Sequence, residues 1–408
     1  MVKKDILNSF TIFVAIITLI TFILNMVNGR FHLGDFMVYY TAAENLISGK
    51  PIYLVSFYSG SGFYKYSPTT LFIFLPYVFF NFKTAAVIHF FILGIAYWYT
   101  LNLIRKLIED YFPLENIKHV YFLLSVSFVC ILIHFTREMY LGNVNILLLM
   151  LCCLSIRNIL TGKAMQGGML LGIVIITKPY LAILLLPLLL RRKWRVIGWL
   201  CLTAACGLII PFIFFGPLRG MDIYGEWVKS IMIHGEDFPG KTSIDYFIRF
   251  HIPSWPEWGI LVVFFFICSI VIMFILRNIR MEKQKETDTS ISDMNFIFEW
   301  FLLIALLPNL IKADWVLLLF STPLIMLMIF DIVSRKKYVW IIVLIPILFF
   351  YGANSDDLLG KAVSHTILES GFMGLSNFLL VMVSLCMFLS LRSSAHTSAL
   401  SGRVSGKD

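Results

Sequence analysis

The sequence has few charged residues and no arrangement of side chains that is typical of a metal site. Asp, Glu, Lys and Arg make up only 14% of the 408 residues, whereas 59% are hydrophobic. A soluble domain cannot bury that much apolar surface, so these proportions exclude an ordinary soluble globular protein. The seven cysteines lack metal-ligand spacing, and the eight histidines include no HExxH pair. We therefore expect no structural metal and no cofactor, while metal dependence stays open.

The sequence instead contains a succession of long apolar stretches, which predict an all-α polytopic membrane protein. Because no water reaches the bilayer core, the backbone groups of a spanning segment must bond within it, as they do in a helix. The first stretch, about Ile6 to Val27, follows Lys3 and Lys4 as the core of a signal peptide would. No small-residue cleavage site follows it, so we expect a retained signal anchor.

The net charge of +9 is interpreted as a sign of membrane orientation and not of a nucleic-acid partner. Lysine and arginine are enriched in the cytoplasmic loops of membrane proteins. Of the 33 Lys and Arg residues, 21 lie in the N-terminal segment, in five short connections or in the C-terminal tail. With these segments and both termini inside, about twelve spans are predicted. They are approximately 6–27, 84–104, 118–135, 145–156, 166–178, 179–190, 196–215, 258–276, 296–308, 314–333, 338–351 and 372–391.

Residues 68–82 are apolar but are not counted as a span. If residues 28–66 lie outside and Arg105 lies inside, the chain between them must cross an odd number of times. We therefore expect Lys83 to stay outside and residues 68–82 to form a short interfacial or re-entrant helix.

Residues 166–190 are predicted to cross the membrane out and back, with Lys178-Pro179 at the turn. One full crossing needs roughly 20 residues, so both arms are short. Such a pair requires a polar cavity at membrane depth, which is the usual setting of broken helices around a buried site. A single span is the alternative, but it would place one of two strongly basic loops outside.

The first external segment, residues 28–83, combines a predicted amphipathic helix with a polar, aromatic turn. The helix is indicated by DFMVYYTAAENLISGK and is expected to end at Gly49, and YSGSGFYKYSPTT follows it. Asp35 has two interpretations. An acid after a glycine in a loop is more often a helix N-cap, and Asp35 is well placed to cap a helix over residues 36–48; the other interpretation is a catalytic carboxylate beside the lipid. The residues alone leave both interpretations open.

A second polar segment, TREMYLGNVN, precedes the fourth predicted span. Its side chains are interpreted either as an ion pair with a helix cap or as the lining of a site, since polar groups at membrane depth are costly. The residues that raise this question, all predicted on the outer side, are Arg137, Glu138, Asn143, Asn145, Lys178, Lys312 and Asp314.

Two short patterns are interpreted without a catalytic role. GEDFPGKT, residues 235–242, matches the phosphate-binding pattern GxxxxGK[ST], but that mechanism needs a strand before the loop and a helix after it. We interpret it as a chance match in an external loop. GMLLG, residues 168–172, has small residues at the spacing of a helix–helix contact.

Six segments, taken in chain order, carry a family resemblance. They are GDFMVYYTAAENLISGKPIY (34–53), FYKYSPTTLFIFLP (63–76), YLGNVNILLLML (140–151), GGMLLGIVIITKPYLAILLLPLLLRRKWR (167–195) and, more faintly, KTSIDYFIRF (241–250) and LLPNLIKADWVLLLFSTPLI (306–325). Together they resemble glycosyltransferase family 87, a group of polyprenyl-phosphate-sugar-dependent transferases with the C-type membrane fold. The resemblance covers most of residues 1–330, and beyond about 335 only hydropathy matches.

The resemblance implies a C-type glycosyltransferase fold with a catalytic module at 1–335, C-terminal membrane helices at 336–391 and a disordered cytoplasmic tail at 392–408. It implies inverting sugar transfer at the external or periplasmic face of the bacterial cytoplasmic (inner) membrane, from a polyprenyl-phosphate sugar donor. Asp35 matches the aspartate expected to act as the catalytic base. The implied substrate-binding residues are Tyr39, Tyr64, Lys65, Tyr66, Arg137, Asn143, Asn145, Lys178, Arg249, Lys312 and Asp314.

Two departures from the family pattern concern the substrate. Many relatives carry a histidine where this chain has Ala313-Asp314. Either Asp314 substitutes as a polar contact, or recognition of the donor or acceptor differs. The KTSI stretch also lacks the Asn-Gln often found there, so the identity of the sugar stays open.

We therefore predict a hexosyltransferase, with mannose favoured, that acts on an envelope glycolipid or glycan. The competing prediction is a transporter or flippase of lipid-linked sugars, which should show paired inverted repeats and ionisable residues at mid-span. The sequence shows no such repeat, and its charges lie at span ends. A polymerase or ligase of surface glycans would favour a large external loop late in the chain, whereas the longest predicted loops are early and central.

Overall fold

The computed structural model describes residues 8–57, 62–114, 117, 119–237, 240–256, 258–284, 289–311, 314–353 and 355–404. These residues form helices and connections with no β-strand, which confirms the predicted all-α class. Eight helical segments in this described part of the chain are long and apolar enough to cross a membrane. The chain is therefore a multi-pass membrane protein.

The helices fall into three groups by length and hydropathy. The candidate spans are α1 (Ser9–Val27), α3 (Phe82–Tyr111), α4 (Val120–Leu141), α8 (Trp194–Phe215), α11 (Gly259–Gln284), α12 (Thr289–Leu310), η4 with α13 (Trp315–Ser321, Thr322–Ser334) and α17 (Phe372–Val404). Shorter apolar segments are η1 and η2 (Pro68–Ile73, Leu75–Phe79), α5 (Asn145–Leu160), α6 (Ala164–Thr177), η3 with α7 (Pro179–Leu184, Leu185–Leu190) and α14 (Val339–Gly352). The others are α2 (Gly34–Ile47), α9 (Pro217–Asp237), α10 (Ile244–His251), α15 (Asp356–Leu359) and α16 (Lys361–Glu369).

Each predicted span coincides with one apolar helical segment, although four of these segments are short. A helix of 14 residues, such as α6 or α14, is about 21 Å long, whereas the bilayer core is about 30 Å thick. Full crossing by the four short segments therefore stays a prediction. Residues 68–82, expected as one short helix, instead form the two 3-10 helices η1 and η2 followed by the start of α3. Pro68 is the first residue of η1 and Pro76 the second of η2, positions at which proline is tolerated.

The chain divides into two compact units. The first unit contains residues 1–103 and 134–239, and the second contains residues 104–133 and 240–408. Helices α3 and α4 each contribute to both units. This division by contacts differs from the predicted ranges 1–335, 336–391 and 392–408, which describe function and stay a prediction.

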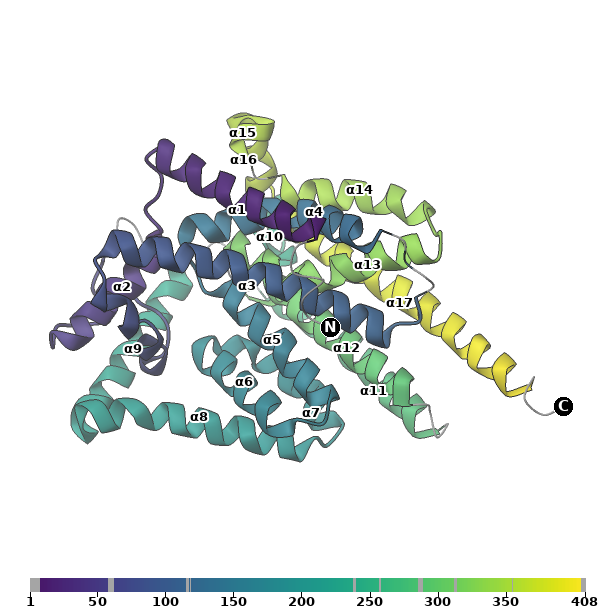
Figure 1. The fold of residues 1–408 in the computed structure, drawn as a ribbon, viewed down its shortest axis with the longest axis horizontal. Coiled ribbons are helices and arrows are strands. Elements are labelled where there is room, and N and C mark those ends of the chain that lie inside the picture. The colour runs from purple at the N-terminus through teal and green to yellow at the C-terminus, as the bar shows by residue number, and fades with distance from the viewer. Residues whose placement is uncertain are drawn as a thin grey trace. The chain divides into compact units, whose positions relative to one another are not determined.

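Within the first unit, α6 packs between α5 and α8 (Figure 1). The Ser155 hydroxyl donates to the carbonyl of Gly167 at 2.8 Å across the turn that joins α5 to α6. Gly168 lies against Val196, whereas Ile176 lies against Gly207, so α6 and α8 run in the same direction. The chain between them must return to the starting end. This geometry shows that the chain reverses direction between α6 and α8, so residues 166–190 do not form one continuous helix, while crossing of the membrane by both arms stays a prediction.

The hairpin turns at Lys178, where the α-helix ends in an extended conformation (φ −135°, ψ 96°) and Pro179 follows. Proline disfavours the helical conformation of the residue before it, so the sequence itself ends α6 at this point. The break places the end of α6 beside the start of α5, and these two ends contribute to the site described below.

Gly168 fulfils the predicted role of a small residue at a helix contact. A Cβ atom at Gly168 would lie 2.4 Å from the carbonyl oxygen of Val196 in α8. We expect Gly168→Ala to destabilise the protein by about 1–3 kcal/mol, because backbone in α8 would have to move. Thermal unfolding in detergent measures the effect. Gly198→Ala is the matched control, since a Cβ there meets nothing within 4 Å; equal melting temperatures for the two variants would contradict the prediction.

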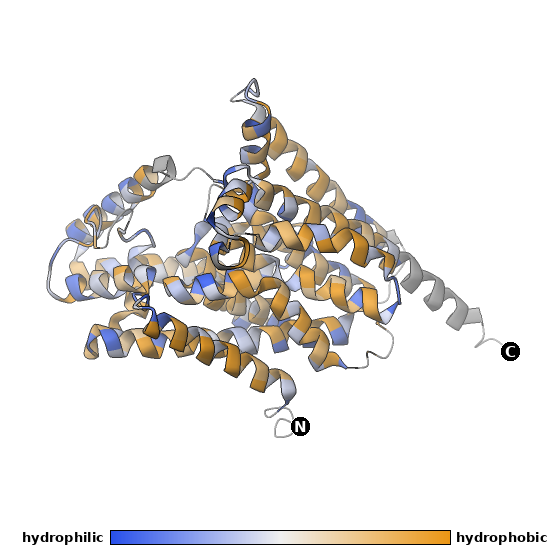
Figure 2. Cartoon of the chain, turned by 90° about the horizontal axis from the view of Figure 1, so that it is seen from above, coloured by the Kyte–Doolittle hydropathy of each residue, from blue (hydrophilic) through white to orange (hydrophobic). Residues whose placement is uncertain are grey.

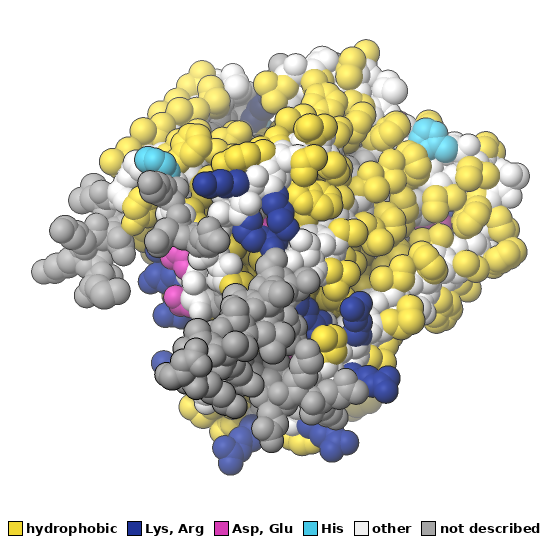
Figure 3. Space-filling view, turned by 90° about the vertical axis from the view of Figure 1, so that its right-hand side faces the viewer, with side chains coloured by type: hydrophobic (Ala, Val, Ile, Leu, Met, Phe, Trp, Pro, Cys, Tyr) yellow, Lys and Arg dark blue, Asp and Glu magenta, His cyan; other side chains and the backbone are white. Residues whose placement is uncertain are grey.

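Burial separates the helices that form the interior from those that face lipid. Most residues of α12, η4 and α13 are buried, whereas α1, α8 and α11 expose much of their apolar length. Figure 2 shows that most helices are apolar along their length and that hydrophilic residues gather at helix ends and connections. Hydrophobic side chains also cover much of the surface drawn in Figure 3. Such exposed apolar surface is what a bilayer covers.

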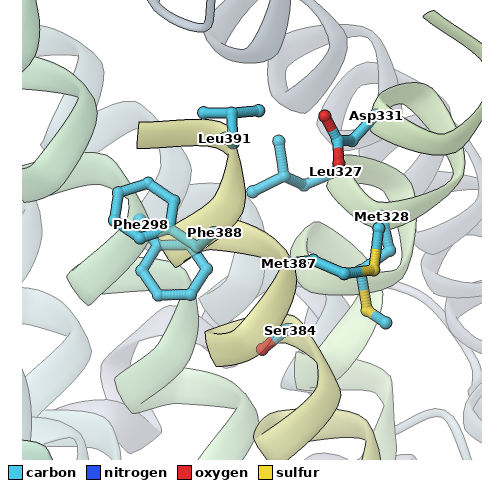
Figure 4. A pocket seen from close by; sticks show the side chains of 8 residues that line it. All are labelled: Phe298, Leu327, Met328, Asp331, Ser384, Met387, Phe388 and Leu391. Carbon is cyan, nitrogen blue, oxygen red and sulfur yellow. The ribbon is translucent and has the colours of Figure 1, made fainter. Parts of the chain in front are cut away.

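The second unit is held together by buried amides as well as by apolar packing. Asn377 of α17 donates to the carbonyl of Ala305 at 3.0 Å and accepts from the Ser321 hydroxyl at 2.7 Å. A cavity of about 10 Å³ near α17, lined mainly by apolar side chains with Asp331 at its edge, is barely large enough for one water molecule (Figure 4). Helix α17 continues to Val404, within the segment for which the sequence predicts a disordered tail.

The GEDFPGKT segment begins inside the last turn of helix α9, which ends at Asp237. Residues 238 and 239 lie outside the described part of the chain, and a turn leads into α10. Because a helix and not a strand precedes the segment, the structure confirms that its match to the phosphate-binding pattern is a chance one.

Candidate functional site

Polar and aromatic residues from five segments meet at one end of the first unit. The segments are the first turn of α2, the loop before η1, the last turns of α4, the start of α5 and the end of α6. The contacts that join them link residues far apart in the sequence.

Asp35 lies in the first turn of α2 and is partly exposed. The residue at the N-cap position is Leu33, in a left-handed conformation (φ 41°), and it makes no side-chain capping bond to this helix. The expected capping role of Asp35 is therefore wrong. Its Oδ2 atom instead accepts a 2.6 Å hydrogen bond from the side-chain amide of Asn143. The helix begins one residue before Asp35 and not after it, so its carboxylate is directed to a tertiary partner.

Asn143 is positioned by a tight turn between α4 and α5. Gly142 adopts a positive φ of 67°, and a Cβ atom there would lie 2.8 Å from the Cβ of Phe36. The Oδ1 atom of Asn143 accepts from the backbone N–H of Val144 at 2.7 Å. This bond directs the amide NH₂ of Asn143 toward Asp35, because an amide has its acceptor and its donors on opposite sides.

Two tyrosines extend the network from Asn143. The Tyr66 hydroxyl donates to the Oδ1 atom of Asn143 at 3.2 Å, and the hydroxyls of Tyr39 and Tyr66 are 2.9 Å apart. Burial raises the pKa of both tyrosines well above the ordinary value, and the Asp35 carboxylate raises it further. Both hydroxyls therefore stay neutral at physiological pH and keep the O–H groups that these hydrogen bonds need.

Helix α9 fixes the backbone of the loop that carries Tyr64, Lys65 and Tyr66. The indole N–H of Trp227 donates to the carbonyl of Lys65 at 2.9 Å, and the Ser230 hydroxyl donates to the carbonyl of Tyr64 at 3.0 Å. The Tyr64 ring is fully buried, with its centroid 5.9 Å from that of Tyr66. Tyr64 thus supports the loop.

Lys178 brings a nearly buried positive charge to the same end of the unit. Its Nζ atom donates to the Oδ1 atom of Asn145 at 2.6 Å and lies 5.2 Å from the centre of the Tyr66 ring. The extended break between α6 and η3 is what directs this side chain inward instead of along a helix surface.

Glu138 is a site residue that the sequence did not single out as a substrate contact. Its carboxylate is fully buried and accepts from the side-chain amide of Asn145 at 3.1 Å and from the backbone N–H of Ile146 at 3.2 Å. Glu138 therefore caps α5. The side-chain amide of Asn145 bonds both to Glu138 and to the Lys178 ammonium, so it links the two charged groups. The only sequence signal was an acid near the end of a long apolar stretch.

His89 is a further residue of the site that the sequence did not predict. One ring nitrogen of His89 lies 3.0 Å from the carbonyl of Gly142, and the other lies 3.1 Å from the Tyr77 hydroxyl. The ring stacks on Phe36 with centroids 4.3 Å apart. His89 thus braces the turn that positions Asn143. A single histidine in an apolar helix gives no pattern from which this could be predicted.

The charges around Asp35 oppose the effect of its burial. Burial is the largest influence and raises the pKa of the Asp35 carboxyl. The hydrogen bond from Asn143 and three nearby positive charges lower it, yet the pKa remains above the ordinary value for aspartate. Those charges belong to Lys178, Lys65 and Arg137. Arg137 is half-buried, and its guanidinium carbon lies 5.5 Å from the centre of the Tyr140 ring.

The remaining predicted site residues belong to the second unit or are not described. Arg249 is an exposed residue of α10 that pairs with Asp245 at 3.0 Å. Asp314 caps η4 by accepting from the backbone N–H of Trp315 at 2.7 Å. Lys312 lies outside the described residues. Among the described residues, no three His, Cys, Asp or Glu side chains are grouped so that they could hold a metal ion.

A family model described as glycosyltransferase family 87 matches residues 63–304, which is more than half of the chain. The matched range includes the loop with Tyr64 to Tyr66, the α4–α5 turn and Lys178. It begins after Asp35 and Tyr39 and ends before Asp314. No curated protein matches the chain.

Proposed function

Since the chain belongs to glycosyltransferase family 87, we propose that this membrane glycosyltransferase moves a hexose from a polyprenyl-phosphate carrier to an acceptor hydroxyl group. Mannose is the favoured hexose, and the acceptor is an envelope glycolipid or glycan. Transfer takes place with inversion at the external face of the bacterial cytoplasmic membrane, with both termini inside. The catalytic module comprises residues 1–335, followed by the C-terminal membrane helices.

The observation that carries this proposal is the position of Asp35. A partly exposed carboxylate, oriented by Asn143 and subject to the electrostatic effect of three cationic side chains, lies at the end of a unit built from membrane helices. A general base needs such access to an incoming hydroxyl, and it needs a fixed orientation to be within hydrogen-bond reach of the proton it removes.

The proposed reaction is one displacement at the anomeric carbon. Asp35 takes the proton of the acceptor hydroxyl while that oxygen forms the new glycosidic bond. The bond between the anomeric carbon and the phosphate oxygen breaks on the opposite face, and the polyprenyl phosphate leaves with the electron pair. Attack from the opposite face inverts the configuration of the sugar.

The departing phosphate is already ionised, so it needs positive charge more than a proton donor. Lys178, Lys65 and Arg137 supply that charge in this proposal, since all three act electrostatically on Asp35. Lys178 is the strongest candidate because it is nearly buried, and electrostatic interactions strengthen where water is excluded. The other substrate contacts proposed in the first unit are Tyr39, Tyr66, Asn143 and Asn145.

The purified chain in lipid nanodiscs, supplied with radiolabelled polyprenyl-phosphate mannose and a membrane lipid extract, tests the proposed function. We expect label to move to a glycolipid or glycan, and the anomeric configuration of the product to be opposite to that of the donor. Nanodiscs without the chain are the control. In proteoliposomes, movement of the donor across the bilayer without sugar transfer would contradict the proposal and favour a flippase.

The transfer rate is expected to fall in acid at a higher pH than an ordinary aspartate base would give. The base must be deprotonated, and burial keeps the pKa of Asp35 above its ordinary value. Asn143→Leu removes the hydrogen bond that lowers this pKa, so the acid limb should move to still higher pH. A pH–rate profile of each protein measures both effects. Asn158→Leu, at the other end of α5, is the control and should keep the original profile.

A further inference from the structure

The end of α6 opposite the candidate site contains a feature that sugar transfer does not use. A cleft of about 450 Å³ opens between the α5–α6 turn and the start of α8. It is lined by Gly162, Lys163, Ala164, Met165, Gln166, Arg195 and Trp199. Its volume lies in the range of small-molecule sites, and the length of α6, about 21 Å, separates it from Lys178.

The lining has the chemistry of an anion site. Lys163 and Arg195 contribute two exposed cations, and none of the seven lining residues is acidic. Within the described part of the chain, neither cation forms an ion pair with a carboxylate. The side-chain amide of Gln166 and the indole N–H of Trp199 add hydrogen-bond donors to the same cleft.

The local backbone favours the same kind of ligand. Both α6 and α8 begin at this cleft, and no side chain of the described residues caps either helix. Two N–H groups at the start of α8 already donate, that of Trp194 to the carbonyl of Arg192 and that of Val196 to the carbonyl of Lys193, whereas the N–H groups in the first turn of α6 attract negative charge. They add to the attraction of the two cations, which by themselves already define the charge of the cleft.

The surroundings indicate a lipid and not a soluble anion. Trp194 and Trp199, together with Met165 and Met169, expose apolar surface beside the cleft. Tryptophan is enriched at the membrane–water boundary, and basic pockets between membrane helices on the cytoplasmic side bind anionic headgroups. The basic connection of residues 191–195 is predicted to be cytoplasmic from the distribution of charge.

We propose that this cleft binds the phosphate of an anionic phospholipid headgroup. Lys163 and Arg195 contact the phosphate oxygens, and the exposed tryptophans lie against the glycerol and the first part of the acyl chains. A lipid bound there joins the start of α6 to the start of α8, the two helices whose parallel packing holds the hairpin and Lys178 in place. The proposal does not depend on the sugar that the protein transfers.

Native mass spectrometry of the detergent-purified full chain tests the proposal, because it counts the lipid molecules that each protein molecule retains. Phosphatidylglycerol, phosphatidylcholine and soluble glycerol 3-phosphate are the three probes. We expect phosphatidylglycerol to be retained in preference to phosphatidylcholine. Lys163→Gln combined with Arg195→Gln should weaken its binding about thirtyfold, since each juxtamembrane cation contributes about 1 kcal/mol. Lys163→Arg combined with Arg195→Lys keeps both charges and should preserve most of the binding.

The matched control is Lys106→Gln combined with Lys336→Gln, which removes two exposed cations of the predicted cytoplasmic face that do not line the cleft. This pair should leave retention unchanged. Equal loss in both charge-removing pairs would show general attraction to a basic surface and overturn the site. Unchanged retention in the cleft variant would also overturn it. Displacement of the lipid by glycerol 3-phosphate at similar concentration would reassign the cleft to a soluble phosphate compound.

Discussion

Asp35→Asn is expected to reduce the rate of sugar transfer by about 10²–10⁴-fold, the range usual for loss of a general base. The side chain keeps its size, but an amide cannot accept the proton of the attacking hydroxyl. Asparagine also places an NH₂ group where the carboxylate oxygen accepts from Asn143, so part of the loss comes from a changed orientation. Release of radiolabelled sugar into product, followed over time at saturating donor, measures the change.

The control for Asp35→Asn must separate chemistry from folding. Asp222→Asn makes the same chemical change at an exposed position of α9 and should leave transfer unchanged. Both variants should melt within a few degrees of the unmodified protein, because Asp35 is partly exposed. Near-normal transfer by a folded Asp35→Asn protein would remove Asp35 as the base. The pH profile of any residual activity should also lose its acid limb.

The distribution of apolar residues and basic connections predicts much of this fold. Every predicted span corresponds to an apolar helical segment, because backbone hydrogen bonding within lipid leaves the helix as the available structure. The hairpin at Lys178-Pro179 also follows from charge, since a single span would put a basic loop on the wrong side. The parallel packing of α6 and α8 shows independently that the chain reverses direction there.

Hydropathy alone does not predict where α4 ends. The predicted span stops at residue 135, whereas the helix continues to Leu141 and includes Arg137 and Glu138. A polar side chain can be buried in the protein when its hydrogen-bonding groups have partners. Glu138 accepts from a backbone N–H and from a side-chain amide, both of α5. Hydropathy describes each residue without its tertiary partners, so a span predicted from hydropathy ends at the first polar residue.

The role of Asp35 shows the same limit for the candidate site. Sequence alone made a helix cap the simpler interpretation, because capping depends only on neighbouring residues. The hydrogen bond to Asn143 joins residues 108 positions apart, through a turn that requires the positive φ of Gly142. No periodicity in the sequence encodes such a pairing. The family resemblance supplied the hypothesis, and the structure excludes the cap because α2 begins at Gly34, before Asp35.

Lys178→Met is the second substitution for which a large effect is expected, a loss of about 10²–10³-fold in transfer rate. That range is typical when a fixed group that stabilises developing negative charge is removed. Methionine keeps the length of the apolar stem but removes the ammonium that binds Asn145 and lies over the Tyr66 ring. Lys178→Arg retains the charge and should keep a larger share of the activity. Lys229→Met, at an exposed position of α9, is the matched control and should transfer normally.

The pH dependence distinguishes an electrostatic role of Lys178 from a merely structural one. The positive charge of Lys178 lowers the pKa of Asp35, so its removal raises that pKa and a higher pH is needed to keep the base ionised. In the Lys178→Met protein the acid limb of the rate profile should therefore move to higher pH, whereas Lys178→Arg should leave it nearly in place. A Lys178→Met protein that loses activity equally at every pH would assign the residue to packing of the hairpin. Full activity in that variant would exclude Lys178 from binding the departing phosphate. The half-buried cations Lys65 and Arg137 would then have to supply the charge.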